Sequence, residues 1–231
     1  MTDSTPVSTG SSAVDEVLGG GLSRGTITQV YGPPAAGKST LAMSSAVAAA
    51  GGGTAVYLDT EGLSFDRLEQ IAADRDGETA ALDRIMVTRA GTFDEQAARI
   101  RDVASVTDDL DLVVLDSATA LYRLERTNEG DDGEALDRLG NQLAFLLSIA
   151  RRYDLAVLAT NQVFTDPDTD TIRPLGGETM AHWCGTIARL DRFRGPRRRF
   201  SLEKLRGDPA DQVVMLELID GGFAGLDVAP P

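Results

Sequence analysis

The sequence predicts an α/β fold with a mainly parallel central sheet, helices on its faces and antiparallel strands at the C-terminal end. Up to Thr160, short runs rich in β-branched residues alternate with helical stretches, which is the pattern of a parallel sheet. A glycine-rich loop joins the first strand-like run to a helical one. After Gly176 the strand-like runs follow one another without long helices, which indicates antiparallel additions to the sheet.

The individual elements follow from the spacing of apolar residues. Strands of the parallel part are expected at residues 26–31, 54–59, 84–88, 110–116 and 155–160. Helices are expected at residues 38–50, 64–74, 93–106 and 135–153. The later strands are expected at residues 185–192, 199–204 and 213–220. Two polar stretches, 125–134 and 164–174, are expected to be mobile loops.

Length and composition predict one domain. The chain has 231 residues, of which 42% are hydrophobic, and neither a linker nor an internal repeat divides residues 1–231. The apolar runs are too short to cross a bilayer and the N-terminus lacks a secretory signal, so we expect a cytoplasmic protein that does not enter a membrane. The lone Cys184 is expected to be a small buried residue and not a catalytic thiol.

The charge balance is strongly acidic, with 36 acidic residues, 22 basic residues and a formal net charge of −14. Lys38 and Lys204 are the only lysines, and all other basic residues are arginines. A lysine-poor, acidic surface suits a salt-filled cytoplasm, where charge repulsion is screened over a few ångströms. The composition therefore indicates a halophilic source, with acidity for solubility alone as the simpler interpretation.

One segment reverses this sign. Residues 189–206 contain eight basic and two acidic residues, a net charge of +6, with Phe193 and Phe200 among the arginines. This mixture suits single-stranded DNA, because arginines contact phosphates while aromatic rings stack on bases. The expected DNA-binding residues are Arg194, Arg197, Arg198 and Arg199. A solvated β-hairpin around Gly195 is the alternative interpretation.

Residues 32–39, GPPAAGKS, fit the phosphate-binding loop pattern GxxxxGK[ST] and lie between a predicted strand and a predicted helix. Backbone N–H groups of such a loop form a concave anion site, to which Lys38 adds a positive charge. Ser39 supplies a hydroxyl ligand for Mg²⁺. The residues expected to bind the nucleotide are Gly32, Pro33, Pro34, Ala35, Ala36, Gly37, Lys38, Ser39 and Thr40.

Two carboxylates follow neighbouring predicted strands. The apolar run 110–116 ends in Asp116, and ligands of doubly wound sheets bind at the carboxyl ends of strands, so Asp116 is expected to hold Mg²⁺ opposite Ser39. The strand at 54–59 leads into Glu61, which is then expected to face the terminal phosphate as the base that orients or deprotonates water. An ordinary polar strand end is the alternative for Glu61.

The chain resembles the archaeal RecA-type recombinases almost from end to end. Residues 7–15, the run LGGGL at 18–22 and the run GTITQVYG at 25–32 are similar to the entry of that family's core. The resemblance implies a RecA-like P-loop NTPase core that binds ATP with Mg²⁺. It also implies DNA binding and participation in homologous recombination and repair.

The same resemblance implies roles for single residues. Lys38, Glu61 and Gln162 would be the catalytic ones, and Glu61 lies in the run DTEG that activates water in the family. Gln162, in the run TNQV, would sense the terminal phosphate and pass that state to the following DNA-facing loop at 164–174. His182 matches a segment near the subunit interface, or is a packing residue. Arg67 would stack on adenine, with a helix-surface arginine as the equal alternative.

Departures from the family pattern refine the expected function. The main archaeal recombinase RadA carries an N-terminal helix-hairpin-helix domain and a Phe-x-x-Ala peptide that docks on its neighbour, whereas only six residues precede Val7 here. The loop residues 33–36 differ from those of RadA, and the first DNA loop has only Arg123 and Arg126 as basic residues.

We therefore expect a core-only paralogue that forms monomers or small oligomers. It would bind DNA, hydrolyse ATP weakly and assist RadA without strand exchange of its own. A signalling ATPase of the circadian-clock type, with no DNA role, is the alternative. A small-molecule kinase fits less well, because no acceptor-binding lid is evident.

Overall fold

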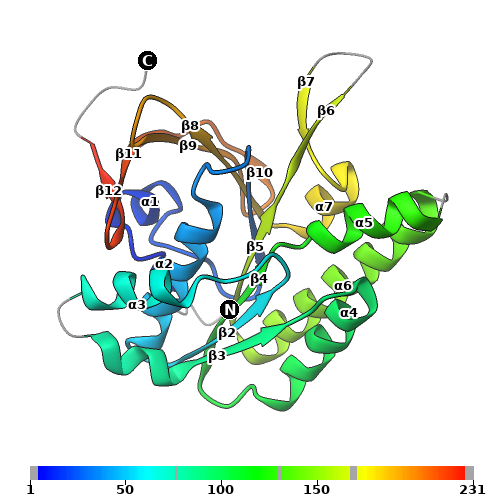
Figure 1. Ribbon diagram of the computed structural model, residues 1–231, viewed down its shortest axis with the longest axis horizontal. Coiled ribbons are helices and arrows are strands. Elements are labelled where there is room, and N and C mark those ends of the chain that lie inside the picture. Colours follow the sequence, from blue (N-terminus) through cyan, green and yellow to red (C-terminus); the bar gives the residue numbers. More distant parts are fainter. Residues whose placement is uncertain (1–4, 76–77, 130–131, 167–170, 227–231) are drawn as a thin grey trace.

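A ten-stranded sheet runs through the centre of the computed structural model (Figure 1), which describes residues 5–75, 78–129, 132–166 and 171–226. The strand order is β12-β11-β9-β8-β1-β5-β4-β2-β3, and β10 pairs with β9 outside this path. From β8 through β1, β5, β4 and β2 to β3 all neighbours are parallel. From β8 to β12 all neighbours are antiparallel.

The parallel strands are β1 Ile27–Tyr31, β2 Thr54–Asp59, β3 Ile85–Arg89, β4 Leu110–Asp116 and β5 Ala156–Asn161. The later strands are β8 Thr186–Arg192, β9 Arg197–Leu205, β10 Asp208–Pro209, β11 Val213–Ile219 and β12 Gly222–Gly225. A separate hairpin consists of β6 Val163–Asp166 and β7 Thr171–Pro174, and it projects from the top of Figure 1.

Helices cover both faces of the sheet. The α-helices are α1 Ser12–Val17, α2 Lys38–Ala50, α3 Phe65–Ala73, α4 Phe93–Asp102, α5 Ala120–Glu129, α6 Asp132–Tyr153 and α7 Gly177–Trp183. Two 3-10 helices, η1 Glu78–Arg84 and η2 Val103–Ser105, connect them to strands. Two apolar cores result, one between the sheet and α1, α2 and α3, and the other between the sheet and α4, α5, α6 and α7 (Figure 1).

Side-chain chemistry accounts for these elements. The central strands β1, β2, β4 and β5 are buried on both faces, which is why they are mainly apolar and do not alternate between apolar and polar residues. The hydroxyls of Ser64 and Thr92 accept hydrogen bonds from N–H groups of the first turns of α3 and α4, and so fix where these helices begin. The predicted fold class is confirmed by this topology.

Both predicted mobile loops were partly wrong. In the stretch 125–134, α5 continues through Glu129 and α6 begins at Asp132, because the Glu and Arg residues of this stretch favour helix and the two helices pack on each other. In the stretch 164–174, β6 and β7 pair as a hairpin, to which Phe164 and Ile172 contribute strand-forming side chains. The parts of both predictions at residues 130–131 and 167–170 lie outside the described residues.

Two further expectations concern burial. Cys184 is fully buried, as predicted, and this burial raises the pKa of its thiol to about 12. Over the residues described by the structure, no helix is both long and apolar enough to span a membrane.

Candidate functional site

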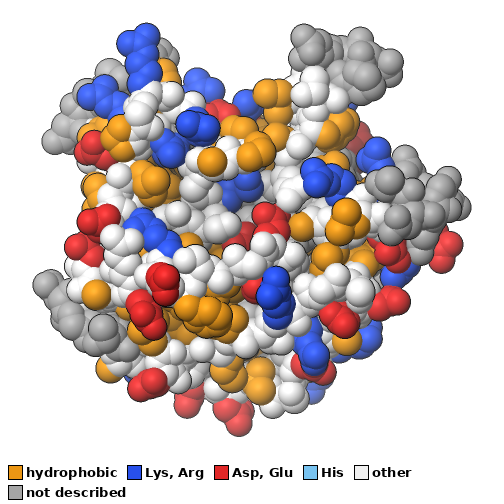
Figure 2. Space-filling model, viewed as in Figure 1, with side chains coloured by type: hydrophobic (Ala, Val, Ile, Leu, Met, Phe, Trp, Pro, Cys, Tyr) orange, Lys and Arg blue, Asp and Glu red, His pale blue; other side chains and the backbone are white. Residues whose placement is uncertain are grey.

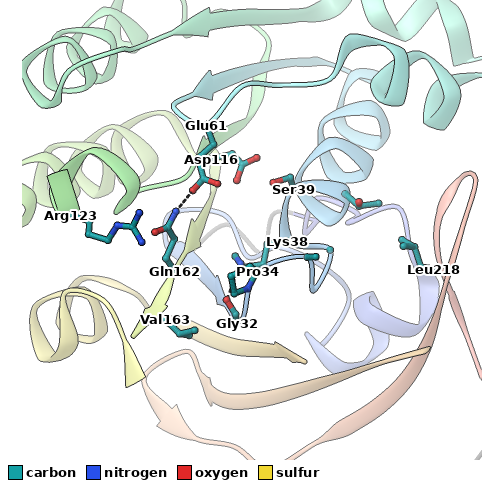
Figure 3. Close-up of a pocket in the computed structure, with 13 residues that line it drawn as sticks. Gly32, Pro34, Lys38, Ser39, Glu61, Asp116, Arg123, Gln162, Val163 and Leu218 are labelled. Atoms are coloured by element: carbon teal, nitrogen blue, oxygen red, sulfur yellow. Dashed lines mark hydrogen bonds between the residues drawn. The ribbon is translucent and has the colours of Figure 1, made fainter. Parts of the chain in front are cut away.

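A cavity of about 500 Å³ lies at the carboxyl ends of the parallel strands (Figure 3). The phosphate-binding loop after β1, Glu61 after β2, Asp116 at the end of β4 and Gln162 after β5 all contribute to its wall. These four segments meet because the strands are parallel neighbours, so their carboxyl ends form one edge.

Most residues expected to bind the nucleotide line this cavity, namely Gly32, Pro34, Ala35, Gly37, Lys38, Ser39 and Thr40. Pro33 and Ala36 are absent from its lining, and Ala36 is fully buried beneath the loop.

Two glycines of this loop are required by its geometry. A Cβ atom on Gly32 would lie 2.0 Å from the carbonyl oxygen of Leu190 on the neighbouring strand β8, so only glycine fits there. Gly37 has a φ of +108°, and a Cβ atom on it would lie 2.6 Å from the Phe223 ring. Ala35 also has a positive φ, of 58°, which an L-residue with a side chain adopts at a cost.

Lys38 points back onto its own loop (Figure 3). Its Nζ donates hydrogen bonds to the carbonyl oxygens of Gly32 at 2.8 Å and Pro33 at 3.1 Å. Burial lowers the pKa of Lys38, while the nearby carboxylates of Glu61 and Asp116 act in the opposite direction. The ammonium group is therefore held within the loop, beside the anion site that the loop's N–H groups form.

Asp116 is buried among hydroxyl groups. Its carboxylate accepts hydrogen bonds from Tyr57 Oη at 2.6 Å and from the Thr160 hydroxyl. Burial nevertheless raises the pKa of Asp116. The Ser39 hydroxyl and the Asp116 carboxylate both line the cavity, and oxygen donors of this kind hold Mg²⁺ in proteins when phosphates supply further ligands. In the described ranges no group of three or more His, Cys, Asp or Glu could hold a metal ion without such help.

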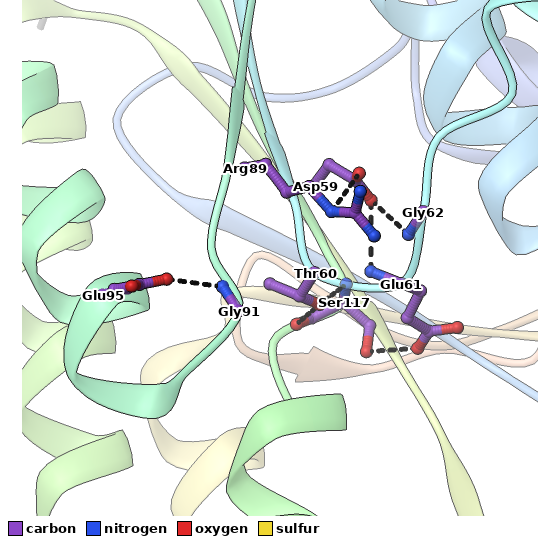
Figure 4. A network of polar contacts seen from close by, with 8 residues as sticks. All are labelled: Asp59, Thr60, Glu61, Gly62, Arg89, Gly91, Glu95 and Ser117. Carbon is purple, nitrogen blue, oxygen red and sulfur yellow. Dashed lines mark hydrogen bonds and ion pairs between the residues drawn. The ribbon is translucent and has the colours of Figure 1, made fainter.

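Glu61 is held by two donors that reach the same carboxylate oxygen. Gln162 Nε2 lies 2.6 Å and Ser117 Oγ 2.7 Å from Glu61 Oε1 (Figures 3 and 4). The backbone N–H group of Glu61 donates to Asp59 Oδ1 at 3.1 Å, which fixes the turn after β2. The sequence prediction did not include Ser117 or Asp59. Their only signal was that each lies at the end of a strand that leads into the site.

Gln162 connects the cavity to the β6–β7 hairpin. Its carbonyl oxygen accepts a hydrogen bond at 2.9 Å from the N–H group of Leu175, which directly follows β7. Next to it, Asn161 Nδ2 donates to the carbonyl oxygen of Leu175 at 2.9 Å, and Thr119 Oγ1 donates to Asn161 Oδ1 at 2.6 Å. Both strands of the hairpin are therefore tied at their base to the residue that contacts Glu61.

The four predicted DNA-binding arginines do not share one surface. Arg194 and Arg197 are exposed in and beside the β8–β9 turn, and the Arg194 guanidinium lies 5.9 Å from the centroid of the Phe193 ring. Arg199 is partly buried and pairs with Asp191 at 3.3 Å.

Arg198 is buried beneath the phosphate-binding loop and donates to its carbonyl groups, so the expectation that it contacts DNA is corrected. Successive side chains of a strand point to opposite faces, which separates Arg198 from its neighbours Arg197 and Arg199. Phe200, on the same face as Arg198, is fully buried and cannot stack on a base.

Figure 2 shows the distribution of charge on the face that carries the cavity. Lys and Arg side chains are frequent over the upper part and the centre of this face, whereas most Asp and Glu side chains lie along its left, right and lower edges. In a chain with a net charge of −14, basic side chains are thus concentrated towards the upper part of this face.

Comparison with known proteins decides the family. A model of the Rad51 family matches residues 3–215. The DNA repair and recombination protein RadB of Halobacterium salinarum is 52% identical over 226 residues, which cover 96% of this chain and 95% of that protein. This chain belongs to the RadB family. RadB of Methanoculleus marisnigri is 43% identical, over 88% of this chain and 90% of that protein. A crystal structure of a RadB recombinase matches with a TM-score of 0.81 and 35% identity, over 96% of this chain and 100% of that one.

RadB proteins are RecA-type proteins of DNA repair and recombination, so the resemblance to the archaeal recombinases is confirmed. The RecA-type core is a nucleotide-binding fold that generally takes ATP with Mg²⁺, and its members interact with DNA. The Halobacterium relative also agrees with the haloarchaeal source expected from the acidic, lysine-poor composition.

Two smaller expectations stay predictions within the RadB-family fold. Arg67 donates to Gln70 Oε1 at 2.6 Å and to the carbonyl oxygen of Ile219 at 2.8 Å, and it does not line the cavity at the carboxyl ends of the parallel strands. His182 is exposed, and its ring packs edge-on to Trp183 at a centroid distance of 5.0 Å.

Proposed function

We propose that this protein is an ATP- and Mg²⁺-dependent DNA-binding protein of the cytoplasm that assists the main recombinase RadA in homologous recombination and repair. One observation carries the proposal. The phosphate-binding loop, Asp116, Glu61 and Gln162 line one cavity, and Gln162 is hydrogen-bonded to the base of a projecting hairpin. A hydrogen bond thus joins the proposed nucleotide site to the hairpin that we propose faces DNA.

The roles of the residues follow from their positions. The N–H groups of the loop and the Lys38 ammonium group would bind and orient the phosphates, and Thr40 follows them at the start of α2. Ser39 Oγ and the Asp116 carboxylate would hold Mg²⁺. That ion, when bound, neutralises charge on the transferred phosphoryl group. Glu61 would accept a proton from the attacking water, and Gln162 would donate to the terminal phosphate.

Weak hydrolysis is supported by the contacts of the proposed base. Gln162 and Ser117 both donate to Glu61 Oε1, the oxygen that would otherwise accept a proton from water. A phosphate that drew Gln162 away would free one of these positions and pull on the hydrogen bond to Leu175. In this way the state of the nucleotide would reach the hairpin, whose Phe164 and Ile172 side chains are exposed.

DNA binding is proposed for the exposed part of the arginine cluster. Arg194, Arg197 and the neighbouring Phe193 combine positive charge with an exposed ring, which suits a single strand. Arg199 lies nearby but shares its guanidinium with Asp191. We assign phosphate contact to the first two arginines and a secondary role to Arg199.

The accessory role is inferred from what the RadB relatives share with this chain. The chain spans 95% of the Halobacterium protein and 90% of the Methanoculleus protein, so a RecA-type core of this length is common to them. We propose that residues 1–231 act as one such domain, as a monomer or small oligomer without strand exchange of its own. The outer strand β3 provides a free sheet edge at which a peptide of RadA could pair.

A salt-resolved titration of single-stranded DNA, with and without Mg·ATP, tests this proposal. We expect binding that weakens with salt, because phosphate contacts release counterions, and that changes with the nucleotide. A pull-down with RadA and electron microscopy on DNA accompany it, with RadA association and no regular filaments expected. ATP binding without association with either DNA or RadA would favour a signalling ATPase. Regular filaments of the pure protein would favour a self-sufficient recombinase.

A further inference from the structure

Arg198 connects the phosphate-binding loop to the β8–β9 turn. Its Nε donates to the carbonyl oxygen of Ala36 at 2.8 Å, and its Nη2 reaches that of Ala35 at 3.5 Å. Its Nη1 donates to the carbonyl oxygens of Gly195 at 3.0 Å and Arg197 at 2.9 Å. One planar, buried guanidinium group therefore holds the loop on one side and the turn on the other.

The charge of this group is unusual for its position. Within the part of the chain that the structure describes, no carboxylate pairs with Arg198, and all its hydrogen bonds go to main-chain carbonyl groups. Burial and the repulsion from Arg192 lower the pKa of Arg198. A buried cation without a counter-ion is costly, and an anion that arrives at the adjoining loop reduces that cost. The guanidinium group is therefore expected to be drawn towards the loop when phosphate is bound.

Two hydrogen bonds close the turn that Arg198 holds, and the N–H group of Leu218 on β11 donates to the carbonyl oxygen of Pro196 in that turn at 2.9 Å. The N–H group of Phe193 donates to the carbonyl oxygen of Arg197 at 3.0 Å, and the N–H group of Arg197 donates to that of Arg194 at 3.1 Å. The Arg197 carbonyl oxygen thus accepts both the bond that closes the turn and a bond from Arg198. A shift of the guanidinium group changes the turn directly, and with it the placement of Phe193, Arg194 and Arg197.

We propose that Arg198 is a positioning residue that couples occupation of the phosphate-binding loop to the shape of the β8–β9 turn, and so to the affinity of Arg194 and Arg197 for a DNA strand. The inference rests on the proposed function, because it requires a nucleotide at the loop and DNA at the turn. It describes a route along β9 that does not involve Gln162 or the β6–β7 hairpin. Since coupling is reciprocal, DNA must strengthen ATP binding by the same factor.

Amide hydrogen exchange of the unmodified protein, with and without saturating Mg·ATP and without DNA, tests the first half of the route. We expect the N–H groups of Phe193 and Arg197 to exchange more slowly with ATP, by about fivefold or more, together with protection of the loop itself. A protected loop with an unchanged turn would overturn the coupling and leave ATP binding intact. No protection at either place would instead contradict the proposed function.

Variants of Arg198 test the second half. The affinity for single-stranded DNA is measured with and without Mg·ATP in the wild type, Arg198→Met and Arg198→Lys, with Arg199→Met as the matched variant on the opposite face of β9. We expect ATP to strengthen DNA binding about fivefold or more in the wild type and less than about twofold in both Arg198 variants. Arg199→Met should weaken binding in both conditions and keep the wild-type ratio.

A merely structural Arg198 would lower the unfolding temperature and leave this ratio unchanged, which would overturn the proposal. A wild-type ratio in Arg198→Lys would also overturn the bridging role, because a lysine keeps the charge without the planar fork. Thermal unfolding identifies variants that fold. If Arg198→Met does not fold, the lysine variant and the exchange measurement on the wild type decide the outcome.

Discussion

The two halves of the central sheet place their functional residues by different rules. In the parallel half, Lys38, Glu61, Asp116 and Gln162 come from four separate segments, yet they meet at one cavity because parallel strands end at the same edge. In the antiparallel half, three consecutive arginines of β9 point to alternating faces, and Arg198 is separated from its neighbours. Residues at the ends of parallel strands therefore lie together at one site, whereas consecutive residues within one strand lie on opposite faces of the sheet.

The largest expected effect concerns Glu61, the proposed base in the parallel half. Glu61→Gln should still bind ATP but lose hydrolysis by about 10²–10⁴-fold, because an amide cannot accept a proton from water. Single-turnover hydrolysis measures this even when steady-state turnover is slow. Glu95→Gln, which alters an exposed carboxylate on α4 that accepts a bond from Gly91, should hydrolyse at the wild-type rate. Equal rates in Glu61→Gln and the wild type would show that Glu61 is not the base.

Asp116→Asn is expected to weaken Mg²⁺ binding and to raise the stability of the fold. The variant should lose the Mg²⁺ dependence of ATP binding, about a tenfold effect or more, since a neutral amide is a poor ligand for a hard cation. It should also unfold less readily at neutral pH, because the buried charge is removed. Calorimetric titration of ATP with and without Mg²⁺, and denaturant unfolding, measure the two effects. Retained Mg²⁺ dependence would contradict this assignment.

The pH dependence of stability provides an independent check on Asp116. Burial raises its pKa in the folded protein above the ordinary value of 3.8, so between the unfolded and the folded pKa the folded state binds more protons than the unfolded chain. The contribution of Asp116 to stability is therefore largest at low pH and falls as the pH rises through that window. Asp116→Asn should lack this fall when its unfolding is measured over the same pH range.

In the antiparallel half, we expect a smaller effect on DNA binding from changes in the exposed β8–β9 turn. Replacing Arg194 and Arg197 together by glutamate should weaken single-stranded DNA binding about tenfold or more for all sequences, because phosphate contacts carry no base information. The slope of log affinity against log salt should fall by about 1.4, for two lost contacts. Arg84→Glu, at an exposed site elsewhere, should change neither quantity. An unchanged slope in the double variant would leave the turn as a solvated hairpin.

The smallest expected effect concerns backbone strain in the loop. Ala35 has a φ of 58°, so Ala35→Gly should raise the unfolding free energy by up to about 1 kcal/mol. Ala36→Gly, one residue further along, should lower it by about 1 kcal/mol, because its methyl group is fully buried. Denaturant unfolding of both variants measures the difference. Equal shifts in the same direction would show that Ala35 is not strained.

The contrast between the parallel and the antiparallel half of the sheet also explains which features the sequence could predict. The phosphate-binding loop and the strand that ends in Asp116 are recognisable because their residue types and spacing are local. The position of Arg198 could not be found from composition, since a net positive charge over 18 residues gives no strand register. A hairpin turn at Gly195 with β9 starting at Arg197 would have placed Arg198 on the face of the buried Phe200. Ser117 was missed because its role depends on a partner, Glu61, in a distant segment.

The hairpin β6–β7 illustrates a second limit. Its strands are short, β7 is mostly exposed, and Asp166 with the prolines at 167 and 174 suggested a loop. What holds the hairpin is pairing between its own strands and the bonds of Leu175 to Gln162 and Asn161, which are tertiary contacts. Such contacts leave no periodic signal in a sequence.

The central claim is that the nucleotide binds at the carboxyl edge of the parallel strands. The most direct test is calorimetric titration of Mg·ATP into the wild type and into Lys38→Ala at high salt. Within the described ranges, Lys38 donates only to the loop carbonyls of Gly32 and Pro33, so its removal opens no core cavity. We predict one ATP per wild-type chain and binding at least about 100-fold weaker in Lys38→Ala, with unchanged unfolding temperature. Arg84→Ala should bind as the wild type does. Equal affinity in the wild type and Lys38→Ala would contradict the account.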